Sequence, residues 1–424
     1  MENVVQFVKS NASDDVQVLD RNRQIPFSTG QYRVEEVRIS ESACIFFAHC
    51  NDPQQQETQR RVVIKVLRQY KDNRYNLATL QDRQRCQLEA LRINQKFTDG
   101  IYCGLESIYP PPNKNIWDCQ TNDVVDIKTI NRNSEYALIM EALPAKCRLD
   151  HLLSRLLERS TLSGAEVIKQ YLDVLIQRII FLHNDDISQP LSANDHDSYG
   201  YQWGSPQQIQ TKLKHNFKLY DLIAKIDKGL YTEYRGIKQD LHDIAIHPLF
   251  RKYLMQRIEE SQIKHCHGDL KVTNIWLDDS EQDVQDKVFI LDAIDFNASY
   301  SNIDTLSDLA MLVVDIETYT GEKQMASDLI QKYLSYTKAV GMEAAQGVLQ
   351  YYLAEKALVR AAVSLYFDSK NSELPFDAGR TFLKIASRNV DELKHALSLQ
   401  KSSFPGMQRL SSSFYSSLRP KPIG

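Results

Sequence analysis

Short runs of hydrophobic residues, separated by polar segments, occupy the first third of the chain. The runs at 32–39 (YRVEEVRI), 43–49 (ACIFFAH) and 62–67 (VVIKVL) predict strands, the first two joined as a hairpin. Residues 82–97 (DRQRCQLEALRINQKF) are rich in helix formers and predict a helix that ends near Gly100. Because YALIMEAL (136–143) predicts another strand, we expect a β-sheet with one helix inserted after its third strand.

From residue 144 onward, the hydrophobic positions follow the period of an α-helix. The leucines at 149, 152, 153, 156 and 157 fall on one face of a helix, and the apolar positions from Ile168 to Leu182 repeat the pattern. After a polar loop at 184–204, further helices are predicted to about residue 399, interrupted by short strands at 265–296. The patterns therefore predict a β-rich N-terminal lobe followed by a mainly helical C-terminal lobe.

Four segments follow from these boundaries. We predict an N-terminal extension at 1–30, a β-rich lobe at 31–143, a helical lobe at 144–399 and a tail at 400–424. The tail is rich in serine, is basic and lacks acidic residues, so we expect it to be disordered.

Composition excludes several classes of protein. A net charge of -4 gives no reason to expect a nucleic-acid partner. No apolar run is long enough to span a membrane, and the N-terminal residues do not resemble a signal peptide. The seven cysteines are scattered and form no CxxC pair, which argues against a disulfide framework and a structural zinc site. We expect a cytoplasmic protein without a membrane partner.

One segment carries residues suited to chemistry on phosphates. HCHGDLKVTN (265–274) places Asp269 in a glycine-flanked loop and Asn274 five residues later, and Asp292 ends the strand VFIL (288–291). Carboxylate and amide oxygens are the ligands that Mg²⁺ prefers. Each residue alone is more typical of a turn or a helix cap. Their joint order and spacing favour a magnesium-dependent phosphoryl-transfer site.

The same segment resembles a known family, the aminoglycoside phosphotransferase-like kinases, whose catalytic loop reads HGDxxxxN. It is most similar to an uncharacterised bacterial branch that is often fused to a P-loop ATPase domain. The chain shares CHGDL (266–270), DAIDFN (292–297), ID (303–304) and SDLA (307–310) with that branch. Weaker similarity extends to three further stretches, QLEALRINQKF (87–97), WGSPQQIQ (203–210) and KALVRA (356–361).

The resemblance implies an α+β, bilobal protein-kinase-like fold that uses ATP and Mg²⁺. In that reading Asp269 is the catalytic aspartate that aligns the acceptor hydroxyl, and Asn274 and Asp292 hold Mg²⁺. Asp295 either supports the metal through water or anchors its loop, and Asp308 is expected to bind backbone near the catalytic loop. No GxxxxGK[ST] motif occurs in the chain, so a P-loop ATPase partner would be a separate polypeptide.

The N-terminal lobe is expected to bind the nucleotide. Lys65 lies inside an apolar strand, where an unpaired charge is costly, and Glu89 on the following helix is its expected partner. The alternatives are a lysine that faces water from an edge strand and an exposed helix glutamate. Met140, Glu141 and Leu143 are placed like a hinge whose backbone binds adenine, although their side chains also suit a core.

Three functions remain open at this stage. The leading one is a small-molecule kinase that moves the γ-phosphate of ATP to a hydroxyl of an unidentified acceptor. The second is a nucleotide-binding regulator without transferase activity. The third is a protein kinase that acts on a partner or on its own serine-rich tail.

The acceptor is not fixed by the sequence. Acidic residues of the 184–204 loop could bind a polycation or simply face water. Arg360 could bind an anionic group of the substrate or pair with an acid of the chain. Lys271 could contact the γ-phosphate or lie exposed on the surface.

Overall fold

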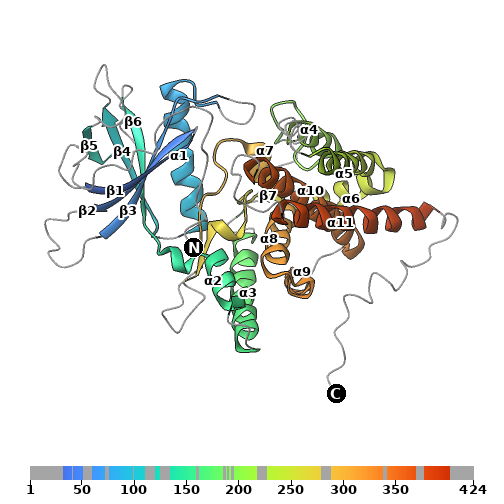
Figure 1. The fold of residues 1–424 in the computed structure, drawn as a ribbon. Helices are drawn as coiled ribbons and strands as arrows, with labels where there is room; N and C mark the ends of the chain where they lie inside the picture. Colours follow the sequence, from blue (N-terminus) through green and yellow to red (C-terminus); the bar gives the residue numbers. More distant parts are fainter. Residues whose placement is uncertain are drawn as a thin grey trace. The chain divides into compact units, whose positions relative to one another are not determined.

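A computed structural model describes most of the chain (Figure 1). The described residues are 32–40, 42–50, 60–71, 76–98, 100–109, 120–124, 134–158, 162–184, 188, 191, 195–216, 227–277, 288–337, 341–368 and 377–401. The predicted N-terminal extension at 1–30 lies outside them, as does the predicted tail beyond residue 401.

The chain divides into two compact units. Residues 1–145 together with 289–297 form the first, which is rich in strands. Residues 146–288 and 298–424 form the second, which is mainly helical. The predicted lobe boundary at 143 lies close to the end of the first part, but the short segment 289–297 returns to the strand-rich unit.

A six-stranded antiparallel sheet forms the strand-rich unit, in the order β1-β2-β3-β6-β4-β5. The strands are β1 (Tyr32–Ile39), β2 (Ala43–Cys50), β3 (Arg60–Leu67), β4 (Tyr102–Tyr109), β5 (Gln120–Val124) and β6 (Glu135–Glu141). Lys65 of the third strand pairs with Ile45 on one side and Leu138 on the other, so it lies on an interior strand. The predicted strands are confirmed.

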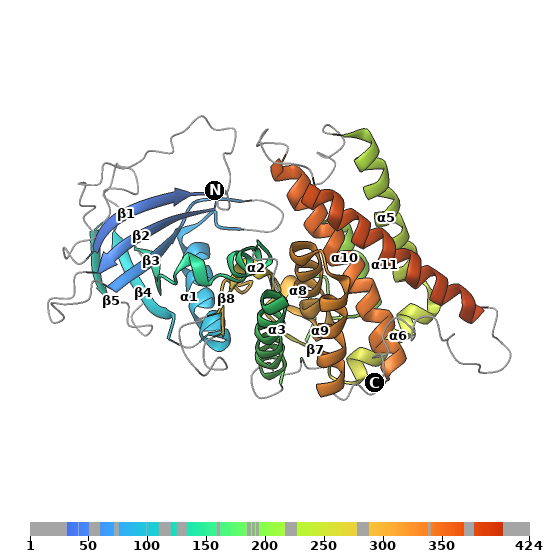
Figure 2. The ribbon, with the colours of Figure 1, turned by 60° about the horizontal axis from the view of Figure 1, so that its bottom comes forward.

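Helix α1 (Leu80–Phe97) packs against β4 and β6, and both ribbon views show it along one face of the sheet (Figures 1 and 2). Its start is fixed by a capping box, in which the Thr79 side chain accepts from the Asp82 N–H and the Asp82 carboxylate accepts from the Thr79 N–H. On the inner face, Gln87 is buried and donates to the carbonyls of Lys65 and Tyr136. These bonds fix the rotation of the helix relative to the sheet.

Helices dominate the second unit, as predicted. They are α2 (Leu149–Glu158), α3 (Leu162–Leu182), α4 (Pro206–Asn216), α5 (Lys228–Ile246), α6 (Pro248–Glu259), α7 (Ala298–Ser301), α8 (Thr305–Thr320), α9 (Lys323–Tyr336), α10 (Met342–Asp368) and α11 (Asp377–Lys401). Short strands interrupt them, namely β7 (Ile263–His265), β8 (Ile275–Leu277), β9 (Val288–Ile290) and β10 (Asn302–Asp304).

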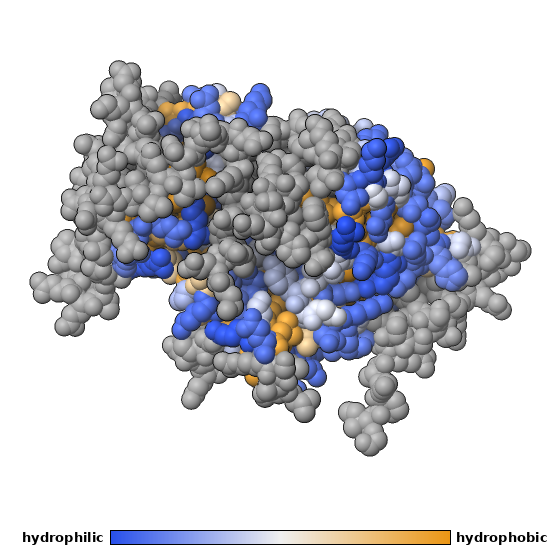
Figure 3. All heavy atoms as spheres, viewed as in Figure 1, coloured by the Kyte–Doolittle hydropathy of each residue, from blue (hydrophilic) through white to orange (hydrophobic). Residues whose placement is uncertain are grey.

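Helix α8 is the centre of this unit. Every residue from Thr305 to Ile316 is buried, and the helix packs against α2, α9, α10 and α11. On the face shown in Figure 3, the described surface of the helical unit is mostly hydrophilic. Within the described residues, no helix combines the length and the apolar character that crossing a membrane requires.

A buried ion pair connects α6 to the start of α8. Arg257 donates two hydrogen bonds to Asp304, at 2.9 and 2.8 Å, and both side chains are almost completely buried. The same carboxylate accepts from the Leu306 N–H and so caps α8. One aspartate therefore both neutralises a buried arginine and fixes where the central helix begins.

Replacing Arg257 with methionine should destabilise the protein by about 3–5 kcal/mol, because the Asp304 carboxylate would remain buried without its cation. Urea unfolding of the two proteins measures this difference. Arg251→Met is the matched control, since Arg251 is exposed on the same helix; its cost should be below about 0.5 kcal/mol. Equal costs for the two variants would show that the buried pair does not hold the start of α8.

Candidate functional site

One buried carboxylate binds the backbone of the HGD loop, which is formed by His267, Gly268 and Asp269. Asp308, in the first turn of α8, accepts from the backbone N–H groups of His267 at 3.0 Å and Gly268 at 2.8 Å. Gly268 has a φ of 85°, a left-handed conformation that favours glycine. The loop then passes through a 3₁₀ turn (Val272–Asn274) into β8. The prediction that Asp308 binds backbone near this loop is confirmed.

Asp308 is itself kept charged by its surroundings. Burial alone would raise its pKa, but the hydrogen bond from His183 and the backbone N–H groups of the loop lower the pKa of Asp308 below its ordinary value. His183 Nε2 lies 3.3 Å from the Asp308 carboxylate, and His183 Nδ1 lies 2.8 Å from the Tyr333 hydroxyl. Cys266 lies in the same buried cluster, where burial raises the pKa of its thiol well above the ordinary value. A charged carboxylate thus sits beneath the loop.

Asp269 follows the two backbone groups that Asp308 binds, and it is surrounded by polar partners. Its carboxylate accepts from Lys271 Nζ at 2.5 Å and from Asn274 Nδ2 at 3.3 Å. Burial opposes ionisation, but the charge and the hydrogen bond of Lys271 lower the pKa of Asp269. Its side chain is 27% exposed, so the carboxylate is ionised and accessible. Lys271 is half-buried beside it and is not the exposed surface lysine that the sequence also allowed.

A second buried acid, Asp315, holds the other end of the loop. It accepts from the Val272 N–H at 3.2 Å and from Arg360 Nε at 2.7 Å. Of the two readings of Arg360, the structure therefore shows the pairing with an acid of the chain. Sequence reasoning missed Asp315, although a signal existed. Asp308 and Asp315 are seven residues apart, with only apolar residues between them, a spacing that places both on one face of the helix.

In the strand-rich unit, Asp292 is positioned by its backbone. The Asp292 N–H donates to the Tyr102 hydroxyl at 2.9 Å, and the next N–H, of Ala293, donates to Asn94 Oδ1 at 2.8 Å. Asp292 has a φ of 63°, which is uncommon for a residue other than glycine and is therefore imposed by these anchors. Its carboxylate is 65% exposed and lies 3.2 Å from Lys65 Nζ.

The two expected nucleotide residues have different partners in this structure. Lys65 forms the ion pair with Asp292, and the Glu89 carboxylate accepts from Arg92 one turn further along α1. The rotation set by Gln87 explains this difference, because a residue two positions later lies roughly 200° around the helix. A pairing of Lys65 with Glu89 stays a prediction.

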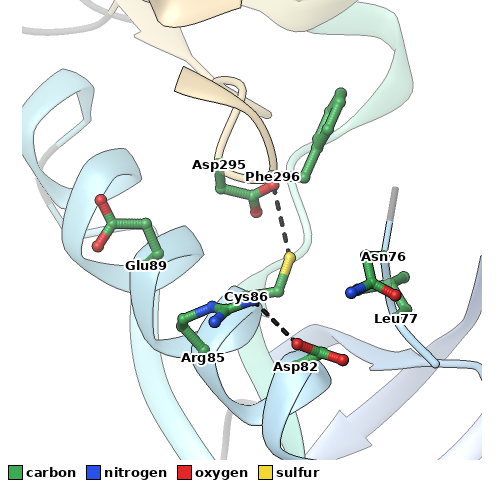
Figure 4. Close-up of a pocket in the computed structure, with 8 residues that line it drawn as sticks. All are labelled: Asn76, Leu77, Asp82, Arg85, Cys86, Glu89, Asp295 and Phe296. Atoms are coloured by element: carbon green, nitrogen blue, oxygen red, sulfur yellow. Dashed lines mark hydrogen bonds and ion pairs between the residues drawn. The ribbon is translucent and has the colours of Figure 1, made fainter. Parts of the chain in front are cut away.

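Glu89 lines a small pocket between α1 and the segment after β9 (Figure 4). In this view Cys86 and Asp295 point toward each other, with the Cys86 sulfur 3.9 Å from Asp295 Oδ1. Burial, together with the nearby charge of Asp292, raises the pKa of Asp295 to about 6. Asp295 thus contacts α1, as an anchor of the loop would, and its support of a metal through water stays a prediction.

The predicted hinge residues lie at the end of β6. The Glu141 N–H donates to the Ile101 carbonyl, and the Ala142 N–H donates to the Arg61 carbonyl. Met140 and Leu143 are half-buried and pack against the core of the strand-rich unit. The side chains of Met140 and Leu143 therefore contribute to the core, and adenine binding by this segment stays a prediction.

Comparisons with known proteins identify the fold. No family model matches the chain, and no curated protein matches its sequence. Choline kinase from Cryptosporidium parvum Iowa II is similar in structure, with a TM-score of 0.50 and 11% identity over 88% of this chain and 94% of that chain. The predicted α+β kinase-like fold, with a strand-rich and a helical part, is confirmed.

Two further solved structures are similar at lower scores. An ethanolamine kinase from Plasmodium vivax has a TM-score of 0.43 and 13% identity, covering 83% of this chain and 81% of that chain. A thermostable mutant of the aminoglycoside phosphotransferase APH(4)-Ia has a TM-score of 0.42 and 12% identity, covering 85% of this chain and 95% of that chain.

Replacing Asp308 with alanine should cost about 3 kcal/mol or more, because two buried backbone N–H groups would lose their acceptor. Hydrogen exchange at His267 and Gly268 should accelerate more than exchange elsewhere in the helical unit. Asp308→Asn is the matched control, since it keeps one acceptor oxygen and should give an intermediate loss. Unchanged exchange at both amides would contradict the proposed anchoring.

The pH dependence of the Asp308→Asn difference has a definite sign. Because the pKa of Asp308 is lowered on folding, its carboxylate stabilises the protein at neutral pH, and that contribution is lost as the pH falls through the lowered value. Asparagine does not titrate, so the difference in unfolding free energy between the two proteins should narrow below about pH 4. A difference that stays constant to pH 3 would argue against this origin.

Proposed function

We propose that this protein is an ATP- and Mg²⁺-dependent phosphotransferase that moves the γ-phosphate of ATP to a hydroxyl group of a small molecule. The observation that supports it most strongly is the constellation around Asp269. The Asp269 carboxylate is ionised and accessible. Asp308 fixes the backbone just before it, and Lys271 and Asn274 donate hydrogen bonds to it. Phosphoryl transfer depends on positioned groups of this kind more than on covalent catalysis.

In the proposed reaction, Asp269 accepts a hydrogen bond from the acceptor hydroxyl and orients its oxygen toward the γ-phosphorus. The oxygen–phosphorus bond forms as the bond between the γ-phosphorus and the β–γ bridging oxygen breaks, and ADP leaves. The hydroxyl proton passes to the Asp269 carboxylate and then to solvent. Lys271, already next to this carboxylate, neutralises charge on the transferring group.

The residues proposed for Mg²⁺ fit a hard cation. Asn274 is buried, and its Nδ2 donates to both the carbonyl and the carboxylate of Asp269. This orientation leaves Oδ1, which accepts no hydrogen bond from any described residue, as the ligand atom. Asp292 contributes an exposed carboxylate. When bound, Mg²⁺ would shield the phosphate charges, and the oxygen donors that it prefers are those present here.

The strand-rich unit is the proposed nucleotide-binding part. Lys65 is assigned to the α- and β-phosphates and Glu89 to its support, and Met140, Glu141 and Leu143 to the segment that binds adenine. A cytoplasmic location, membership of the bacterial branch and a separate P-loop ATPase partner remain predictions. The neighbours in structure are named as choline, ethanolamine and aminoglycoside-modifying enzymes, and a small-molecule acceptor is proposed here by that analogy.

Replacing Asp269 with asparagine should leave the affinity for Mg²⁺·ATP within about threefold, since this residue orients the acceptor, and should reduce phosphate transfer by at least about 10²-fold. Calorimetry measures the first quantity and ADP formation with acceptor the second. The control Asp243→Asn, at a carboxylate 61% exposed on α5, should change neither. Full transfer activity in Asp269→Asn would refute the assignment.

One observation favours a second candidate, a nucleotide-binding regulator without transferase activity. The Lys271 ammonium occupies the Asp269 carboxylate, and an ion pair of this kind competes with an acceptor hydroxyl for the same oxygen. In the regulator, this ion pair would be a permanent structural feature and not part of a catalytic centre.

Lys271→Met distinguishes the two functions. In the phosphotransferase, losing this cation should lower the rate of transfer by about 10²-fold, and Lys271→Arg should recover part of it. Single-turnover measurements with γ-labelled ATP report the rate. Mg²⁺-dependent ATP binding without any turnover, in the parent protein and both variants alike, would establish the regulator instead.

A further inference from the structure

The WGSP stretch (203–206) fixes the start of helix α4 in the helical unit. Gly204 has a φ of 75°, and a Cβ at this position would lie 2.5 Å from the Ile263 side chain, so only glycine fits. Ser205 then caps the helix, because its hydroxyl accepts from the Gln208 N–H, and Pro206 occupies the first helical position. The motif therefore determines which residues of α4 face inward.

Lys212 is on that inward face. It lies one turn after the buried Gln208 and beside the buried Leu213, and its own side chain is half-buried. Its ammonium lies 5.7 Å from the centre of the Tyr300 ring. Within the described part of the chain, Lys212 forms no ion pair and no hydrogen bond. Lys214, two residues later, faces solvent.

A second lysine is close to the first. Burial, followed by the positive charge of Lys356, lowers the pKa of Lys212 to about 7. Lys356 is 5% exposed on α10 and lies 3.1 Å from the Glu355 carboxylate. The other groups that act on Lys212 are Glu355, Asp308 and Cys266. Two lysines and one glutamate thus share this region, and their summed formal charge is positive.

The carboxylates of this region are already engaged. Glu355 pairs with Lys356, and Asp308 accepts from the backbone of the HGD loop and from His183. Asp315 pairs with Arg360, and Asp269 with Lys271. An additional ammonium in a low-dielectric environment is costly without an anion. No carboxylate of the described residues forms an ion pair with Lys212, although the charges of Glu355 and Asp308 act on it.

The lysine pair lies beside the proposed catalytic centre. The Lys212 ammonium lies 5.7 Å from the centre of the Tyr300 ring, and the next residue, Ser301, accepts through its carbonyl from the Cys266 N–H, three residues before Asp269. Lys356 is one turn before Arg360 on the same face of α10, and Arg360 in turn acts on the pKa of Asp269. WGSPQQIQ thus sets the start of α4, which carries Lys212, and KALVRA carries Lys356 and Arg360 on one face of α10.

We propose that Lys212 and Lys356 form a binding site for an anionic group of the acceptor. This inference rests on the proposed function and specifies its substrate class, an alcohol that also carries a carboxylate or a phosphate group. The anion would pair with Lys212, and the hydroxyl of the same molecule would reach Asp269. A quaternary ammonium or polyamine acceptor would be repelled by the two lysines.

The first experiment measures binding alone. The nucleotide site is filled with Mg²⁺ and a non-hydrolysable ATP analogue, and glycerol 3-phosphate and choline are titrated separately by calorimetry. Glycerol 3-phosphate should bind the parent protein more tightly than choline does. Lys212→Met should weaken the binding of glycerol 3-phosphate by at least about 10-fold, the loss typical of a charge-assisted contact. The control Lys214→Met, on the solvent face of α4, should bind as the parent does.

Three results would overturn the inference: tighter binding of choline, equal binding of glycerol 3-phosphate by the parent and Lys212→Met, or no binding of glycerol 3-phosphate. Loss of folding is not the expected cause of weaker binding. Lys212 is half-buried and forms no ion pair or hydrogen bond with a described residue, so Lys212→Met should preserve or raise the melting temperature. A functional site of this kind carries a stability cost, so an increased melting temperature together with lost binding would support it.

Failure of this inference and failure of the proposed function give different results. If the parent protein transfers phosphate to anionic alcohols and Lys212→Met transfers it equally well, the function stands and the anion site is wrong. If no acceptor is phosphorylated but glycerol 3-phosphate still binds in a Lys212-dependent way, the anion site stands and the phosphotransferase is wrong.

Discussion

The arrangement of the helical unit around the loop that carries Asp269 depends on the buried carboxylate of Asp308. A negative charge at the start of the fully buried part of α8 is stable only because backbone N–H groups of the loop and His183 donate to it. In return, the loop is fixed at His267 and Gly268, immediately before Asp269. Asp315 likewise accepts a hydrogen bond from the backbone of the loop, at the Val272 N–H, and pairs with Arg360. Two acids of one helix thus define both ends of the loop.

The strand-rich unit uses neutral side chains for the same purpose. Asn94, Thr98 and Tyr102 bind the backbone of the segment that carries Asp292, and they hold that residue in a left-handed conformation. The Asp292 carboxylate remains exposed as a result. In each unit, therefore, buried side chains bind the backbone next to one aspartate. The carboxylates of Asp269 and Asp292, to which we assign functional roles, remain accessible.

Much of this could be predicted from the sequence. Hydrophobic periodicity predicted the strands and helices, and the spacing of Asp269 and Asn274 predicted neighbouring polar groups on one loop. The role of Asp308 was also predicted. The partners of Glu89 and Lys65 were not, because a rotation of α1 set by Gln87 depends on hydrogen bonds to two distant strands. The return of 289–297 to the strand-rich unit was missed for the same reason, since nothing local encodes it.

Lys212 shows where sequence reasoning was limited in another way. In the sequence it is one of two lysines in a polar helix, and an exposed position is the ordinary interpretation for each. Only the helix start fixed by Gly204 and Ser205 separates the half-buried Lys212 from the exposed Lys214. The anion site that we propose thus depends on how α4 packs.

The most direct test of the account is the fate of the γ-phosphate. The purified protein is incubated with γ-labelled ATP, Mg²⁺ and a small-molecule extract, in parallel with Asp269→Asn, and the products are separated by charge and size. We predict that label appears in a small molecule only when Mg²⁺ and Asp269 are both present. Label that remains on ATP in every sample, or that enters a product equally well with the variant, would contradict the account.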